Sequence, residues 1–213
     1  MVCNAEGILD NLITGEHWDL SNPLLHPLDL AARLVQEDLC LMQPRDGVYR
    51  LAAASVCFPS RWKLSEKIGR PMLEIHVPVP FYGEKIGAAT DKFMNSLPAG
   101  RPVWRVNWSV HDTPELFQPS APESGLGAIT ASNAGEKLCL RVERQTLRRL
   151  SRSNDILFTI RTIVQPLAEY ENQPAAAAAL AAAIRSLPRE TFAYKSLAGF
   201  ADVVLEWLEN IRE

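Results

Sequence analysis

The sequence predicts an α+β protein in which helices pack on one antiparallel sheet. Three observations lead to this prediction: a long alternating stretch interrupted by a turn, a shorter alternating stretch before it, and an apolar, helix-forming region at the C-terminal end. Alternation with a period of two is typical of strands that cover a core with one face, and apolar residues at helical spacing are typical of helices packed on such a sheet.

The longest strand pattern, residues 138–165, consists of two alternating segments joined by the turn-forming residues 151–155. This pattern predicts a β-hairpin, because Ser, Asn and Asp favour tight turns. A solvated sheet face and a functional patch explain its polar positions equally well. The polar side chains that we expect to gather in one patch are Arg141, Glu143, Gln145 and Arg161.

Residues 102–111 also alternate, with Arg105 and Asn107 on one side and Trp104 and Trp108 on the other, which predicts another strand. The apolar run 49–58 lies between turn residues, and we interpret it as a buried strand. Helices are expected where apolar residues recur at helical spacing. These expected helices cover residues 27–42, 91–97, 175–187 and 191–212, the last with a possible break at Gly199.

The composition is that of a soluble globular protein, with 47% apolar and 22% charged residues in 213. A net charge of -3 gives no electrostatic reason to expect nucleic-acid binding, and no apolar run is long enough to span a membrane. The N-terminus lacks the basic and apolar regions of a secretory signal, and the four cysteines form no CxxC pair. We therefore expect a cytoplasmic protein without a disulfide framework or a zinc knuckle.

His76 is the histidine whose surroundings are most unusual. It lies in a segment with Pro71, Pro78 and Pro80, which we predict to be extended and rigid because proline prevents a regular helix. A neutral imidazole on a rigid backbone suits the axial position of haem iron, although packed histidines are more frequent than ligands. His111 ends a predicted strand, and we expect a structural role for it.

Arg105, Arg141 and Arg161 each lie in a strand-like run with apolar neighbours. A buried guanidinium requires a carboxylate or phosphate partner. Internal pairs with Glu143 or Asp155 and contacts with an acidic ligand, such as haem propionates, remain alternatives. The sequence contains no nucleophile elbow, catalytic triad or phosphate-binding loop, which argues against a hydrolase or a nucleotide-binding protein.

Several segments, in the same order over residues 30–210, together resemble the haem-dependent oxidative N-demethylase family. The combination is specific, whereas each segment alone is a weak signal. The segments that carry the resemblance are residues 36–40, 55–62, 66–69, 75–80, 105–108, 116–119, 141–149 and 158–162.

The resemblance implies a PAS-like fold that holds haem b. It also implies a mono-oxygenase that uses O2 to remove a methyl group from a small alkylamine such as dimethylamine. In that reaction the oxidised N-methyl carbon gives a carbinolamine, which releases formaldehyde. The electrons come from NAD(P)H through reductase partner subunits that carry flavin and an iron–sulfur centre.

The same resemblance suggests His76 as the iron ligand, since it is the histidine inside a matching segment. Arg105, Arg141 and Arg144 are the candidates for contacts with the haem propionates. Glu143 is the candidate for holding a cationic amine, because a charged amine in an apolar pocket requires a countercharge. The roles of the arginines and of Glu143 are physical hypotheses.

Residues 1–213 are expected to form a single haem-binding domain that lacks part of the longer N-terminal region typical of the family. Two alternatives remain open at this point: a haem-binding PAS-like sensor without turnover, and a truncated relative that binds no haem. The loop 118–136 lies between two predicted strands, and we expect it to act as a lid.

Overall fold

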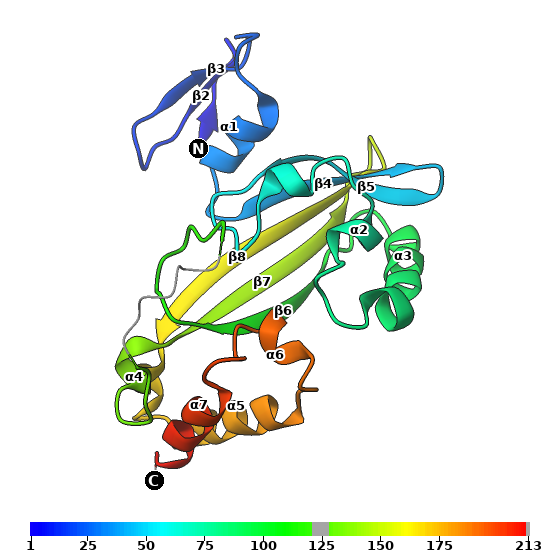
Figure 1. The fold of residues 1–213 in the computed structure, drawn as a ribbon. Coiled ribbons are helices and arrows are strands. Elements are labelled where there is room, and N and C mark those ends of the chain that lie inside the picture. Colours follow the sequence, from blue (N-terminus) through cyan, green and yellow to red (C-terminus); the bar gives the residue numbers. More distant parts are fainter. Residues whose placement is uncertain (121–127, 212–213) are drawn as a thin grey trace.

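The computed structural model describes residues 1–120 and 128–211. In this part of the chain, an antiparallel sheet has the strand order β5-β4-β8-β7-β6 (Figure 1). Together with the helices described below, it confirms the predicted α+β class. Its strands are β4 (Asp38–Arg45), β5 (Val48–Ser55), β6 (Val103–His111), β7 (Cys139–Arg149) and β8 (Ile156–Pro166).

The predicted hairpin is formed by β7 and β8, which pair from Cys139↔Pro166 to Arg149↔Ile156. Cross-strand partners share a face of an antiparallel sheet. Glu143 lies opposite Thr162, whereas Arg144 lies opposite Arg161. Arg161 is therefore on the other face from Glu143, and the prediction that it joins the same patch is wrong.

We call the side of the sheet that carries Arg105, Glu143 and Asp38 face A, and the side that carries Trp108 and Arg144 face B. One apolar cluster covers one end of face A and includes Met94, packed from a helix over the sheet. The helical elements on this side are η1 (Leu64–Glu66), α2 (Met72–Ile75), η2 (Tyr82–Ile86) and α3 (Gly87–Ser96).

A second apolar cluster covers the opposite end of the sheet on face B, where Val110 and Leu140 meet Leu180 and Val204 of the C-terminal helices. Figure 1 shows these helices at the end of the molecule that carries the C-terminus. The helical elements of this region are α4 (Ala134–Lys137), η3 (Leu167–Tyr170), α5 (Pro174–Ser186), α6 (Thr191–Tyr194) and α7 (Ala201–Glu209).

The N-terminal residues form a small three-stranded sheet of their own, followed by a short helix. Figure 1 shows this unit at the end of the molecule opposite the C-terminal helices. Its elements are β1 (Val2–Cys3), β2 (Ile8–Asp10), β3 (His17–Asp19) and α1 (Pro27–Arg33).

The helix predicted over residues 27–42 is wrong in its second half, because α1 ends at Arg33 and β4 begins at Asp38. β4 pairs with β5 on one side and with β8 on the other. Both faces of β4 are also buried, since Leu39 on one face is 6% exposed and Cys40 and Met42 on the other are each 4% exposed. A strand covered on both faces reads as a continuous apolar run. The apolar residues 39–42 therefore extended the apparent helical pattern of residues 27–33 into the strand.

The segment around His76 is also not extended as predicted. Pro71 precedes the single turn of α2, and His76 ends it. The predicted C-terminal helix is divided into α6 and α7, with Gly199 in the break. Part of the loop expected to form a lid, residues 121–127, lies outside the described residues.

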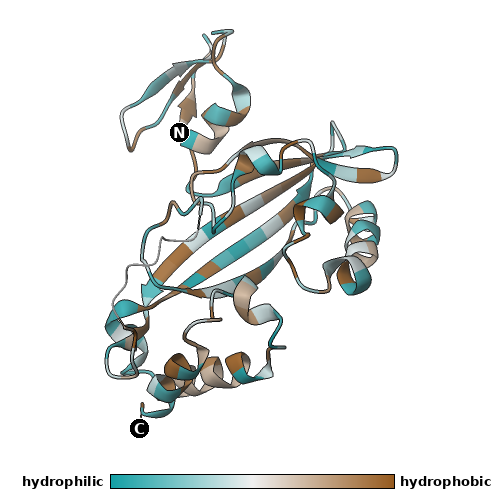
Figure 2. Ribbon diagram, in the orientation of Figure 1, coloured by the Kyte–Doolittle hydropathy of each residue, from teal (hydrophilic) through white to brown (hydrophobic). Residues whose placement is uncertain are grey.

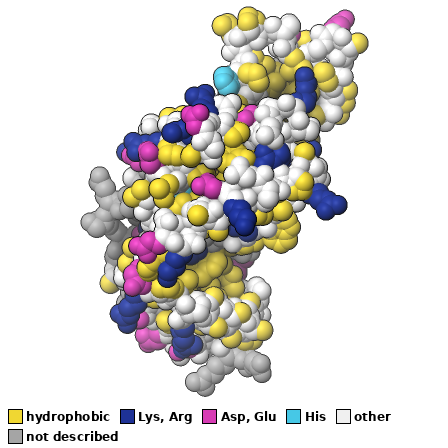
Figure 3. Space-filling view, turned by 90° about the vertical axis from the view of Figure 1, so that its right-hand side faces the viewer, with side chains coloured by type: hydrophobic (Ala, Val, Ile, Leu, Met, Phe, Trp, Pro, Cys, Tyr) yellow, Lys and Arg dark blue, Asp and Glu magenta, His cyan; other side chains and the backbone are white. Residues whose placement is uncertain are grey.

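Figure 2 shows that β7 is largely hydrophilic through its middle, whereas the C-terminal helices carry hydrophobic residues toward the sheet. Figure 3 shows acidic, basic and hydrophobic side chains interspersed on the side of the molecule that it displays. Among the described helices, none has the length and apolar character needed to cross a membrane.

Candidate functional site

His76 is held at the end of α2 by its own helix. Its Nδ1 lies 2.8 Å from the carbonyl oxygen of Met72. A carbonyl only accepts hydrogen bonds, so Nδ1 carries the proton in the neutral ring and Nε2 keeps a free lone pair. The ring stacks on Tyr82 with 4.3 Å between centroids and 9° between planes. This contact and the hydrogen bond together fix the tautomer and the orientation of the ring.

Burial lowers the pKa of His76, and the charges of Lys67 and Arg105 lower it further, although the bond to Met72 opposes this. The imidazole is therefore neutral near neutral pH. A neutral imidazole with Nδ1 bonded to a carbonyl and Nε2 free is the form in which histidine binds a metal.

Glu143 forms the centre of a hydrogen-bonded network on face A. Its Oε2 accepts bonds from the Gln145 amide at 2.9 Å and from the Asn107 amide at 3.3 Å. The Oε1 atom lies 4.0 Å from Nε of Arg141. Glu143 is 9% exposed, so its carboxylate is held by these neighbours rather than by bulk solvent.

The network continues on both sides of Glu143. Nε of Arg105 donates to Oε1 of Gln145 at 2.8 Å. On the other side, Nζ of Lys195 donates to Oδ1 of Asn107 and to the carbonyl of Trp108, both at 2.7 Å. The C-terminal segment after α6 thus reaches round β6 and supplies a cation to face A.

The charge of Arg105 affects the pKa values of His76 and Tyr82 on one side and of Tyr194 and Lys195 on the other. In each case burial has the larger effect. Arg105 therefore lies within electrostatic range of both groups and connects the histidine to the Glu143 network.

Arg141 has a different environment from Arg105. Its side chain is fully buried, Nη2 donates to the carbonyl of Phe58 at 2.6 Å, and Nη1 donates to the carbonyls of Leu116 and Glu115. Its terminal nitrogens are occupied by two loops of the protein. Arg141 was expected to contact an acidic ligand, but its terminal nitrogens bind backbone carbonyls of the protein instead.

Arg144 lies on face B, opposite Arg161, and is exposed. Since neighbouring residues of a strand point to opposite faces, the structure separates it from Arg105, Arg141 and Glu143. Arg161 forms an ion pair with Glu37 at 3.5 Å. The structure thus connects Glu143 through Gln145 to Arg105, whose charge acts on His76, and leaves Arg144 apart from them.

His111 is buried on face A and bonded on both ring nitrogens. Nδ1 donates to Oε1 of Gln118 at 2.8 Å, and Nε2 accepts from the Ser109 hydroxyl at 2.9 Å. Burial lowers its pKa to about 4. With neither nitrogen free, this histidine has the environment of a structural residue.

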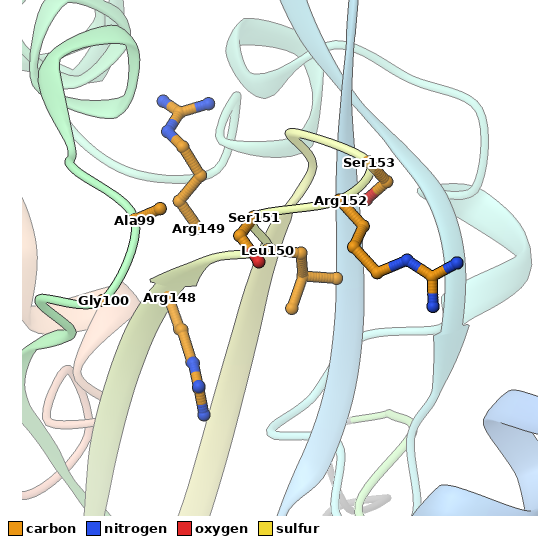
Figure 4. A pocket seen from close by; sticks show the side chains of 8 residues that line it. All are labelled: Ala99, Gly100, Arg148, Arg149, Leu150, Ser151, Arg152 and Ser153. Carbon is orange, nitrogen blue, oxygen red and sulfur yellow. The ribbon is translucent and has the colours of Figure 1, made fainter.

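Two hollows among the described residues lie elsewhere. The larger, of about 510 Å³, is at the turn between β7 and β8, where Arg148, Arg149 and Arg152 point in different directions (Figure 4). The guanidinium group of Arg149 already donates hydrogen bonds to the backbone carbonyls of Leu97 and Asn154. Because the guanidinium groups do not converge there, we place the candidate site at His76 and Glu143 on chemical grounds.

An α+β protein that presents a neutral, oriented histidine beside a charged network on one sheet face has the architecture of a cofactor-binding protein. A family model described as "Haem-dependent oxidative N-demethylase, alpha subunit-like" matches residues 2–205. The chain belongs to this family.

His76 at the end of α2 and Arg105 on face A have the side-chain chemistry required to hold a haem group. The described residues contain no cluster of three or more histidine, cysteine or acidic side chains that would hold a metal ion by themselves. A single histidine suffices for iron that a porphyrin already holds. Among the described residues no hydrogen bond is made to Nε2 of His76, as this role requires, and Arg105 is an exposed cation whose charge acts on the ring.

Sequence reasoning missed Lys195, Tyr194 and Asp38. Lys195 and Tyr194 reach face A from a separate part of the chain, so no local pattern indicates them. Asn107 had a usable signal, since the alternation of residues 102–111 already placed it on the same side as Arg105.

Proposed function

We propose that this chain binds haem b through His76 and catalyses the oxidative N-demethylation of a small alkylamine such as dimethylamine, with release of formaldehyde. Haem supplies the activation of O2 when it is bound. The electrons come from NAD(P)H through a reductase partner with flavin and an iron–sulfur centre. The observation that carries the proposal is the bond from Nδ1 of His76 to Met72, which leaves Nε2 of a neutral imidazole free.

In this proposal His76 holds the iron through Nε2, and Tyr82 keeps the ring in position through the stacking contact. Arg105 pairs with a propionate, because its Nη atoms have no hydrogen bond among the described residues. The five-stranded antiparallel sheet, with short helices over one face, supports the expected PAS-like fold.

Glu143 binds the amine. Its Oε2 already accepts two amide bonds, whereas Oε1 accepts none among the described residues and lies 4.0 Å from Arg141. A carboxylate oxygen has two acceptor positions, so Oε1 is available to an N–H group of the substrate. Asn107 and Gln145 keep the carboxylate in place.

The first test is an absorption spectrum of the haem-loaded protein, reduced and then exposed to carbon monoxide. We expect a Soret band that shifts in both steps. His76→Ala should lose the haem, and added imidazole should restore part of it. His17→Ala is the matched control, because His17 is an exposed histidine paired with Asp10 in the N-terminal sheet.

A second assay decides between turnover and binding alone. Formaldehyde release from dimethylamine with O2 and a chemical or protein reductant is expected for an enzyme. A normal haem spectrum without formaldehyde would support the sensor alternative. Full haem content in His76→Ala would show that another residue holds the iron.

A further inference from the structure

Three buried polar atoms on face A have no hydrogen-bond partner among the described residues. They are Oδ2 of Asp38, Oγ1 of Thr162 and Nε of Arg141. The residues are 1%, 2% and 0% exposed, respectively. Buried polar atoms are nearly always bonded to protein or to an ordered water, so three in one region require an explanation.

The strand register brings these atoms toward one another. Thr162 lies directly opposite Glu143, and Asp38 lies opposite Ile160, two residues from Thr162 on the same face of β8. Arg141 is two residues from Glu143 on β7, with 4.0 Å between its Nε and Oε1 of Glu143. The four polar side chains therefore occupy neighbouring positions on face A.

The backbone of Phe58 provides a second indication of this convergence. Oδ1 of Asp38 accepts from the Phe58 amide at 3.1 Å, and Nη2 of Arg141 donates to the Phe58 carbonyl at 2.6 Å. Both side chains thus meet the same residue of the loop after β5. Consistent with this, the charge of Arg141 lowers the pKa of Asp38, although burial raises it more.

The hydrogen-bonding capacities of these atoms match those of one water molecule. Nε–H of Arg141 is a donor and Oε1 of Glu143 is an acceptor, whereas the Thr162 hydroxyl and the acid form of the Asp38 carboxyl can each donate or accept. With Asp38 in its acid form, Arg141 and Asp38 donate to the water, and the water donates to Glu143 and to the hydroxyl oxygen of Thr162. A water accepts two bonds and donates two, and buried waters typically make about three. The bonding capacities of the four groups are therefore those that a single water molecule requires.

We propose that Asp38, Thr162, Arg141 and Glu143 bind one buried water molecule, and that this water transfers a proton between Asp38 and Glu143. In the transfer, Asp38 in its acid form gives its proton to the water oxygen while the water gives another to Oε1 of the Glu143 carboxylate. Asp38 becomes the carboxylate, Glu143 becomes the acid, and the water is regenerated.

The water site depends only on the fold, whereas its use rests on the proposed role of Glu143 in amine binding. Asp38 then acts as a positioning residue that adjusts the proton on Glu143 without touching the substrate. The charged and titratable groups that face the two carboxyls are Arg141 on β7, Arg105 on β6, Arg61 in the loop after β5, Lys195 and Tyr194 at the end of α6, and Cys40 on β4.

The test uses a high-resolution crystal structure and an infrared pH titration of the full chain without haem or amine. We expect water density within hydrogen-bond distance of the four atoms. The carboxyl band of Asp38, assigned by its loss in Asp38→Asn, should titrate with about tenfold lower proton affinity in Glu143→Gln, because the neighbouring negative charge is lost. Thr162→Val should shift the band, since it removes one bond to the water.

Asp155→Asn is the matched control, because Asp155 is a buried aspartate at the β7–β8 turn, away from this network. Its substitution should leave the band unchanged. A direct bond from Asp38 to Thr162 without water, or an identical titration in Glu143→Gln and the wild type, would overturn the proposal. Because neither measurement involves haem, absence of demethylase activity would leave this result unaffected.

Discussion

Asp38 and Arg141 hold the backbone of Phe58 from its two sides. Asp38 accepts the amide hydrogen at 3.1 Å, and Arg141 donates to the carbonyl oxygen at 2.6 Å. Arg141 also donates to the carbonyls of Leu116 and Glu115. One buried guanidinium therefore fixes two loops over face A, the loop after β5 and the loop after β6.

Arg141→Met should lower the free energy of unfolding by about 3–5 kcal/mol, because it removes a buried charge and leaves several buried acceptors unsatisfied. Urea denaturation followed by circular dichroism measures this change. Arg152→Met, at the exposed β7–β8 turn, should change the stability little. Equal effects of the two substitutions would contradict the role assigned to Arg141.

Arg105→Ala and Arg144→Ala should differ in their effect on haem binding, because the two arginines lie on opposite faces of the sheet. Loss of the propionate contact in Arg105→Ala should weaken haem affinity about tenfold, which corresponds to about 1.4 kcal/mol. Arg144→Ala should bind haem like the wild type. Titration of the apoprotein with haem measures both, and the reverse order of affinities would place the propionates on face B.

The stability of the protein should decrease in acid because of His111. Its pKa is lowered from 6.5 to about 4 in the folded state by burial. Between these values the unfolded chain binds a proton that the folded chain does not, so the free energy of unfolding falls as the pH falls from about 6.5 to 4, by about 3 kcal/mol at most.

Urea denaturation at several pH values in this range, for the wild type and for His111→Gln, isolates this contribution from that of the carboxylates. The variant should be less stable near neutral pH but should depend less on pH. An unchanged pH dependence in His111→Gln would show that His111 is not the group responsible.

Gly135→Ala should destabilise the protein by about 1–3 kcal/mol through overpacking. A Cβ atom at Gly135 in α4 would lie 2.7 Å from Cζ2 of Trp207, whose rigid ring packs from α7 against α4. Gly199→Ala is the matched control, since nothing lies within 4 Å of the added atom there. Thermal melts of the two variants compare them directly, and a lower melting temperature for Gly199→Ala would refute this packing argument.

The sequence predicts correctly the strands whose two faces differ in burial and the helix whose composition strongly favours helix formation. The sequences of β6, β7 and β8 alternate because the two faces of each strand have different environments. The helix α5 is predicted by its alanine-rich composition. β4 was missed because Leu39 on one of its faces and Cys40 and Met42 on the other are all buried, which removes the alternation. Pro44 is tolerated in β4 because the pairing with β8 ends at Met42.

The site was predictable to a similar extent. Glu143 and Gln145 follow from the alternation of β7, and Arg105 follows from that of β6. The separation of Arg144 from Arg141 also follows from this period, whereas the separation of Arg161 depends on the register between β7 and β8. Lys195 could not be predicted, because its position depends on the break between α6 and α7.

The position of Lys195 has a further consequence for the solubility of the protein. β6 is the outermost strand of the large sheet, and the amide of Val110 donates to the carbonyl of Lys195 at 3.1 Å. Unpaired strand edges recruit other chains and promote aggregation. The backbone of Lys195 therefore blocks part of this edge while its side chain serves the charged network, so removal of the segment after α6 should favour self-association as well as disturb the site.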